Sequence, residues 1–161
     1  MKSVERAHIV VMANGDQSLH LAAQLCRIGV AQASLVAGLE QARRLCLAGG
    51  PDLCLVAVDD WAIDAQPVSD LAAPGGECGV PSLLLAHAVT PYMRQMARRC
   101  GYRAAIPVAI APRMLARRIG AALQRHSTPR MARMRQPFAV HAGISRELAA
   151  ELADPRKAKP H

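Results

Sequence analysis

Arginine side chains are the groups in this sequence best suited to binding a ligand, because they gather in a region that contains no acid. Between Glu77 and Glu147 the chain carries twelve arginines and no Asp, Glu or Lys. Residues 1–77 hold five Lys/Arg against nine Asp/Glu, so the net charge of +8 is regional. A guanidinium group offers a planar fork of donors that fits carboxylates and phosphates. The sequence therefore predicts an anion-binding surface in its second half.

The spacing of these arginines places several of them on the outer faces of two predicted helices. Arg94 and Arg98 stand one helical turn apart. Arg113 and Arg117 repeat that spacing further along the chain. Other arginines flank these pairs, and three more follow in a basic tail. The candidate partner-binding or anion-binding residues are Arg94, Arg98, Arg99, Arg103, Arg113, Arg117, Arg118, Arg130, Arg133 and Arg135.

Three kinds of ligand fit such a surface. An acidic protein partner is favoured, because arginine forks match carboxylates in pairs. An anionic nucleotide such as a cyclic dinucleotide comes second, with the tail arginines as additional clamps. Duplex DNA comes third, because phosphates suit arginine but no helix-turn-helix is visible. The plain alternative is a solvated basic face, and like charges so dense disfavour a homodimer through it.

Stacking on single-stranded nucleic acid is nearly excluded, since only four aromatic residues are present.

Carboxylates near the ends of the predicted strands are weaker candidates for a functional site. Asp16 follows one apolar run, Asp59 and Asp60 follow another, and His87 follows a third. Carboxylates at the end of parallel strands could accept a phosphoryl group or hold a metal ion, but solvated turn aspartates are the expected outcome. The chain has no nucleophile elbow, phosphate-binding loop, zinc-spaced cysteine pair or His-Glu-x-x-His motif. We therefore expect neither an enzyme nor a bound cofactor.

Apolar runs that alternate with helical patterns must position these groups. Strands are expected at residues 8–13, 33–36, 53–58, 81–88 and 104–110, and helices at 18–28, 39–47, 68–73, 91–101 and 112–126. On the first helix Leu19, Ala22, Ala23, Cys26 and Arg27 stand at helical spacing. The expected buried stripes are Met93, Met96, Ala97 and Cys100 on the fourth helix, and Leu115, Ile119, Ala122 and Leu123 on the last. Five βα units predict an α/β fold in which helices cover both faces of a parallel sheet.

Composition predicts one domain, residues 1–126, followed by a basic and partly disordered tail, residues 127–161, with a short amphipathic helix near 144–153. Five scattered cysteines, an odd number, favour buried reduced thiols over a disulfide framework. No apolar run is long enough for a signal peptide or a membrane span, so we expect a cytoplasmic protein without membrane contact.

Three stretches of this chain resemble the receiver domain of two-component response regulators. They are PDLCLVAVDDWAIDA, VPSLLLAHA and RRCGYRAAIPVAI, and the resemblance extends over residues 7–126. It implies a flavodoxin-like (βα)5 three-layer sandwich whose five-stranded parallel sheet has the order 2-1-3-4-5. It also implies a role in phosphorelay signal transduction, and partner binding through the fourth helix, fifth strand and fifth helix.

The same resemblance marks where this chain departs from the family. Ala57 stands where receivers carry the phosphoacceptor carboxylate, Ala86 replaces the hydroxyl of the fourth strand, and Val108 replaces the lysine of the fifth. Ala105 takes the place of the aromatic switch residue, and residues 12–14 lack the acids that hold magnesium. The resemblance therefore implies a pseudo-receiver that acts without phosphorylation.

Overall fold

The computed structural model describes residues 3–59 and 71–124. Contacts divide the chain into two compact units, residues 1–127 and 128–161. The second unit lies outside the described residues, and with it the helix expected near 144–153. Asp60, Arg130, Arg133 and Arg135 also fall outside them. In the described ranges, no helix is long and apolar enough to cross a membrane.

Five parallel strands form one sheet, as predicted. They are β1 (His8–Met12), β2 (Gln32–Val36), β3 (Leu53–Ala57), β4 (Ser82–Ala86) and β5 (Ala104–Pro107). Their order is β2-β1-β3-β4-β5, which confirms the flavodoxin-like topology. Every residue of β3 and β4 is buried, which explains why both appear in the sequence as continuous apolar runs. Strands β2 and β5 are the two edges.

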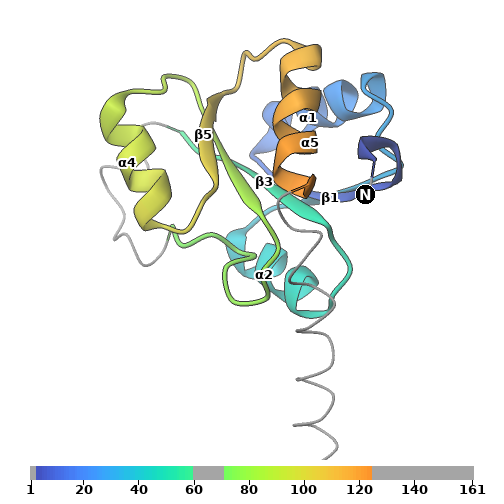
Figure 1. Cartoon of the computed structure of the whole chain (residues 1–161), viewed down its shortest axis with the longest axis horizontal. Helices are drawn as coiled ribbons and strands as arrows, with labels where there is room; N and C mark the ends of the chain where they lie inside the picture. The colour runs from blue at the N-terminus through green and yellow to red at the C-terminus, as the bar shows by residue number, and fades with distance from the viewer. Residues whose placement is uncertain (1–2, 60–70, 125–161) are drawn as a thin grey trace, which may run out of the picture. The chain divides into compact units, whose positions relative to one another are not determined.

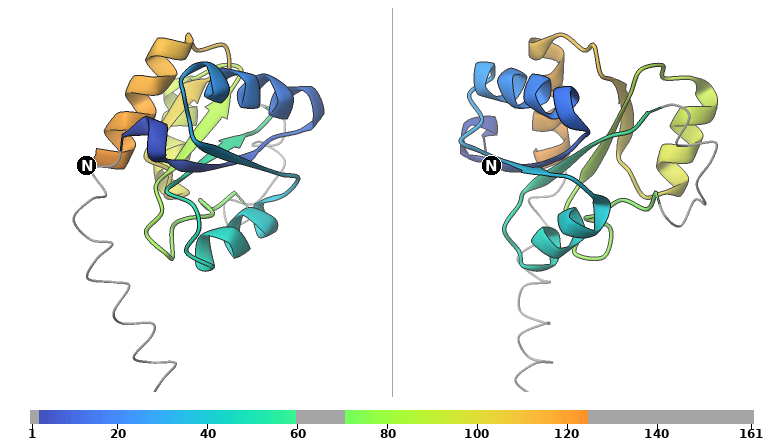
Figure 2. Two further views of the ribbon diagram at one scale, coloured as in Figure 1. Left: turned by 90° about the vertical axis from the view of Figure 1, so that its right-hand side faces the viewer. Right: turned by 180° about the vertical axis from the view of Figure 1, so that it is seen from behind.

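Helices cover both faces of this sheet. The structure has η1 (Val4–Arg6), α1 (Gly15–Arg27), α2 (Leu39–Leu47), α4 (Pro91–Arg99) and α5 (Pro112–Gln124). Helices α1 and α5 share one apolar cluster with the sheet, and α4 and α2 contribute to two clusters on the other face. Figures 1 and 2 show this sandwich, with α1 and α5 on one side and α2 on the other.

The buried stripes predicted for α4 and α5 are confirmed, and the predicted first helix is present as α1, where the buried residues differ from the helically spaced set named from the sequence. Helix α1 buries Leu21, Gln24 and Leu25, whereas Leu19 and Cys26 are exposed. Both stripes have helical spacing. The structure buries Leu21 and Leu25 because they face α5 and the sheet.

The helix expected at residues 68–73 is not present in its described part. Leu71 begins a turn, and the backbone N–H of Ala73 donates to the carbonyl of Cys100 at 2.7 Å. Ala73 is therefore hydrogen-bonded to the residue after α4 and not to a preceding turn of a helix of its own. Residues 68–70 lie outside the described ranges.

Candidate functional site

The carboxyl edge of the sheet is apolar where the central strands end. Ala57 closes β3 and is 2% exposed, and Ala86 closes β4 and is fully buried. Val108 follows β5 and is buried too, and its N–H donates to the Ala86 carbonyl at 2.9 Å. Ala105 is half-buried within β5. Methyl and isopropyl groups can neither accept a phosphoryl group nor stabilise its charge.

The described polar groups around this edge stand on separate segments of the chain. Asp16 is exposed in the first turn of α1, and Asp59 is half-buried two residues beyond β3. His87, just after β4, lies with its Nε2 atom 3.0 Å from Nε2 of Gln17. The ring thus pairs with an amide and not with a carboxylate. Within residues 3–59 and 71–124, no three His, Cys, Asp or Glu side chains come together as metal ligands would.

Helix α4 presents arginines on the side away from the sheet. Thr90 caps the helix, with its Oγ1 accepting from the N–H of Met93 at 3.1 Å, and Pro91 occupies the first turn. The methionine stripe of α4 is buried, and Arg94, Arg98 and Arg99 are exposed. Hydrophobic burial therefore fixes which way these arginines point.

Helix α5 repeats that arrangement on the other side of β5. Its leucine and isoleucine stripe is buried, and Arg113, Arg117 and Arg118 are exposed. Arg103 is exposed in the connection from α4 to β5, where its N–H donates to the Ser82 carbonyl at 2.8 Å. The seven exposed arginines flanking the edge strand β5 are called the arginine face below: Arg94, Arg98, Arg99, Arg103, Arg113, Arg117 and Arg118.

In the part of the chain that the structure describes, ion pairs with acids do not neutralise the six arginines of this face that belong to helices. Arg43 and Arg44 of α2, by contrast, pair with Glu40 on the same helix. The helices of the arginine face also expose two large apolar side chains. Tyr92 on α4 has 57% of its surface exposed, and Met114 on α5 has 43%. Tyr, Met and Arg are enriched at protein interfaces. Sequence reasoning missed both residues because it assigned functions to charged groups alone.

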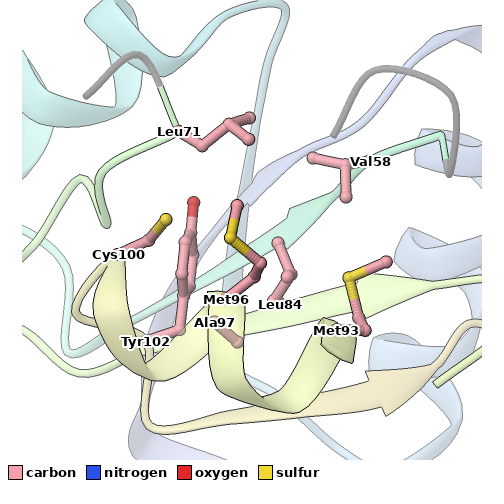
Figure 3. Close-up of a pocket in the computed structure, with 8 residues that line it drawn as sticks. All are labelled: Val58, Leu71, Leu84, Met93, Met96, Ala97, Cys100 and Tyr102. Atoms are coloured by element: carbon pink, nitrogen blue, oxygen red, sulfur yellow. The ribbon is translucent and has the colours of Figure 1, made fainter. Parts of the chain in front are cut away.

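A small cavity lies between α4 and the sheet, and it cannot take a ligand. Its volume is about 10 Å³, roughly room for one water molecule. Figure 3 shows the Tyr102 ring standing between Cys100 and Met96 at this cavity. Burial raises the pKa of Tyr102 well above its ordinary value, and its hydroxyl has no hydrogen-bond partner within the described residues. The other lining residues are Val58, Leu71, Leu84, Met93 and Ala97.

Comparison with known proteins gives relatives by structure alone: no family model and no curated protein sequence matches the chain. A pilus assembly-related protein from Burkholderia pseudomallei superposes with a TM-score of 0.63 at 17% identity, over 80% of this chain and 97% of its own. The signal receiver domain of a modulated diguanylate cyclase from Desulfovibrio desulfuricans gives 0.59 at 19% identity, over 75% and 96%. A CheY-like protein from Pseudomonas aeruginosa gives 0.55 at 16%, over 74% and 94%.

The chain has the fold of a CheY-like receiver domain. Within that receiver fold the loops after β1, β3 and β4 meet at the carboxyl edge, where ligands bind in open α/β sheets. In this chain the strand ends at that edge are apolar, and the exposed charge lies instead on the helices beside β5.

Proposed function

We propose that this chain is a phosphorylation-independent signalling or regulatory adaptor, an atypical response regulator that binds an acidic protein partner through its arginine face. One observation carries the proposal: seven arginines are exposed on the helices and loop flanking β5, in a stretch, residues 78–124, that contains no acid. Tyr92 and Met114 would add apolar contact area beside them.

The carboxyl edge supports the phosphorylation-independent part of the proposal. Phosphoryl transfer depends almost entirely on positioning and on electrostatic stabilisation of the moving charge. Buried Ala57, Ala86 and Val108 offer no acceptor, hydroxyl or ammonium group for this. We accordingly propose that the chain is not an enzyme and is not phosphorylated.

The fold neighbours are consistent with a regulatory role. One is described as pilus assembly-related and another as the receiver of a diguanylate cyclase. An anionic nucleotide or DNA remains the alternative ligand for the same arginines. The protein partner is favoured, because the arginines stand on open helix surfaces and the cavity beside α4 is apolar and about 10 Å³ in volume.

The first experiment measures binding of a labelled glutamate-rich peptide by fluorescence anisotropy, with a cyclic dinucleotide and a duplex DNA as competing probes. We expect saturable peptide binding that the double substitution Arg94→Glu/Arg98→Glu abolishes. The matched control Arg6→Glu/Arg27→Glu makes the same charge change at two exposed arginines outside the face. Tighter binding of DNA, with affinity falling steeply and linearly on a log salt scale, would replace the partner by nucleic acid.

A second experiment incubates the protein with acetyl phosphate and magnesium and records its intact mass. The proposal requires an unchanged mass. A phosphorylated species would refute the phosphorylation-independent role, whatever the peptide experiment gives.

A further inference from the structure

Three cysteines from separate segments of the chain meet on the α2 side of the sheet. Cys46 lies in the last turn of α2 and Cys54 is the second residue of β3. Their Sγ atoms are 3.1 Å apart, and the two residues are 1% and 0% exposed. Cys78, in the turn before β4, is half-buried, and its thiol lies near enough to Cys46 to lower the pKa of that residue. Cys46 is therefore the central sulfur of a three-thiol cluster.

The turn that carries Cys78 is held firmly in place. The N–H of Val80 donates to the Gly75 carbonyl at 2.9 Å, and the Cys78 thiol donates to the same carbonyl at 3.7 Å. A Cβ atom on Gly75 would lie 2.1 Å from the Val80 carbonyl oxygen, so this turn closes only around glycine. The Gly75 N–H reaches Ser82 Oγ at the start of β4, 3.4 Å away. Cys78 is thus positioned between solvent and Cys46.

The contact between Cys46 and Cys54 makes the two thiols unequal. The hydrogen bond with Cys54 lowers the pKa of Cys46, although burial opposes the shift, and the same hydrogen bond raises the pKa of Cys54. Burial, and then the charge on Cys46, raise the pKa of Cys78. The thiolate is the attacking form in disulfide exchange, so Cys46 is the sulfur suited to resolve a mixed disulfide formed on the more accessible Cys78.

We propose that Cys46, Cys54 and Cys78 form a thiol–disulfide exchange site that reduces a low-molecular-weight disulfide of the glutathione type and ends as a Cys46–Cys54 disulfide. The geometry supports this pair, because a sulfur separation of 3.1 Å needs to shrink by only about 1 Å to reach bonding distance. The proposal is independent of the arginine face and of any partner bound there.

The exchange runs in three balanced steps. Cys78, the half-exposed sulfur, attacks the small disulfide as its thiolate, forms a mixed disulfide and releases one small thiolate. The Cys46 thiolate then attacks Sγ of Cys78 and releases the second small thiolate. Finally the Cys54 thiolate attacks Sγ of Cys46 and releases the Cys78 thiolate, which takes up a proton. Two protein thiols are oxidised to one disulfide, the small disulfide is reduced to two thiols, and the two protein protons pass through water to the released small thiolates.

The experiment uses the folded chain with the exposed thiol removed by Cys26→Ser, incubated with oxidised glutathione and then alkylated. The sequence suits peptide mapping, because no Lys or Arg lies between Arg44 and Arg94 and trypsin keeps the three thiols on one peptide. Cleavage before Asp52 then separates Cys46 from Cys54. We expect the tryptic peptide to lack two hydrogens and the two fragments to stay joined. Cys100, a buried thiol outside the cluster, should be alkylated.

Variants test the order of the steps. We expect Cys78→Ala to slow formation of the bond at least about tenfold, and Cys54→Ser to accumulate the Cys46–Cys78 disulfide. The matched control Cys100→Ala should form the Cys46–Cys54 bond at the unchanged rate. A bond that forms only after urea unfolds the domain, or three alkylated thiols on the tryptic peptide, would overturn the proposal. An unchanged rate in Cys78→Ala would overturn the entry role of Cys78.

Discussion

The carboxyl edge of the sheet and the arginine face contrast in polarity and exposure. At the edge the strands end in buried side chains such as Ala57 and Ala86, without a cluster of metal ligands among the described residues. On the face the side chains are long, charged and exposed. A receiver fold can therefore keep its architecture while its central strands end in apolar side chains, because packing and charge are carried by different residues.

Placing a carboxylate at the carboxyl edge should have the largest effect of the changes that test this contrast. Ala57→Asp places a charge in a nearly closed site, and we expect a loss of about 3–5 kcal/mol in the free energy of unfolding, measured by urea denaturation. The neutral isostere Ala57→Asn should cost less, which separates charge from size. We also expect no phosphate on Ala57→Asp after treatment with acetyl phosphate and magnesium. A phosphorylated variant would show that the edge had kept catalytic groups.

Truncating the buried side of α5 should have the next largest effect. Leu115 is fully buried, so Leu115→Ala should lower the free energy of unfolding by about 2–5 kcal/mol. Arg117→Ala, on the exposed side of the same helix, should change it by less than about 0.5 kcal/mol. Equal losses in denaturation experiments would mean that the arginines contribute to the fold and not only to a surface.

Removing the cap of α4 should have a moderate effect. Thr90 accepts a hydrogen bond from the Met93 N–H, and Thr90→Ala should cost about 1 kcal/mol of stability. Faster hydrogen exchange in the first turn of α4 should accompany the loss. The conservative variant Thr90→Ser should retain the cap, and a loss as large as that of alanine would argue against this role.

The polar contact at the carboxyl edge should matter least. Gln17 and His87 form an exposed hydrogen bond, and Gln17→Ala should change stability by less than about 0.5 kcal/mol in the same denaturation assay. Asn14→Ala, at an exposed position next to α1, is the matched comparison. A loss above 1 kcal/mol for Gln17→Ala alone would mean that this pair, and not apolar packing, closes the edge.

The sheet and the helices beside β5 could be predicted from the sequence, and the reasons are physical. Strands buried on both faces leave continuous apolar runs, and Thr90 followed by Pro91 marks a helix start with two independent signals. Helix α1 was different, since its two apolar stripes both have helical period. Choosing Leu21 over Leu19 requires knowing which side of the helix meets the sheet.

The candidate sites, too, could be predicted from the sequence only in part. Exposure of the arginines follows from the methionine and leucine stripes opposite them, so it was predictable from spacing. The thiol cluster was not, because Cys46, Cys54 and Cys78 belong to different segments. Their meeting depends on how α2 packs on the sheet and how the turn at Gly75 closes, neither of which leaves a local pattern.

The length and ending of β5 determine how anything can attach beside it. This edge strand has four residues and ends at Pro107, which lacks an amide hydrogen, so the last bond of the ladder passes to Val108. Pro107 therefore removes a donor on the β4 side of the strand, and it is the shortness of β5 that resists the addition of a further strand. Association at this edge must then rely on side chains and not on backbone pairing, so its specificity can be changed by single substitutions without extending the sheet.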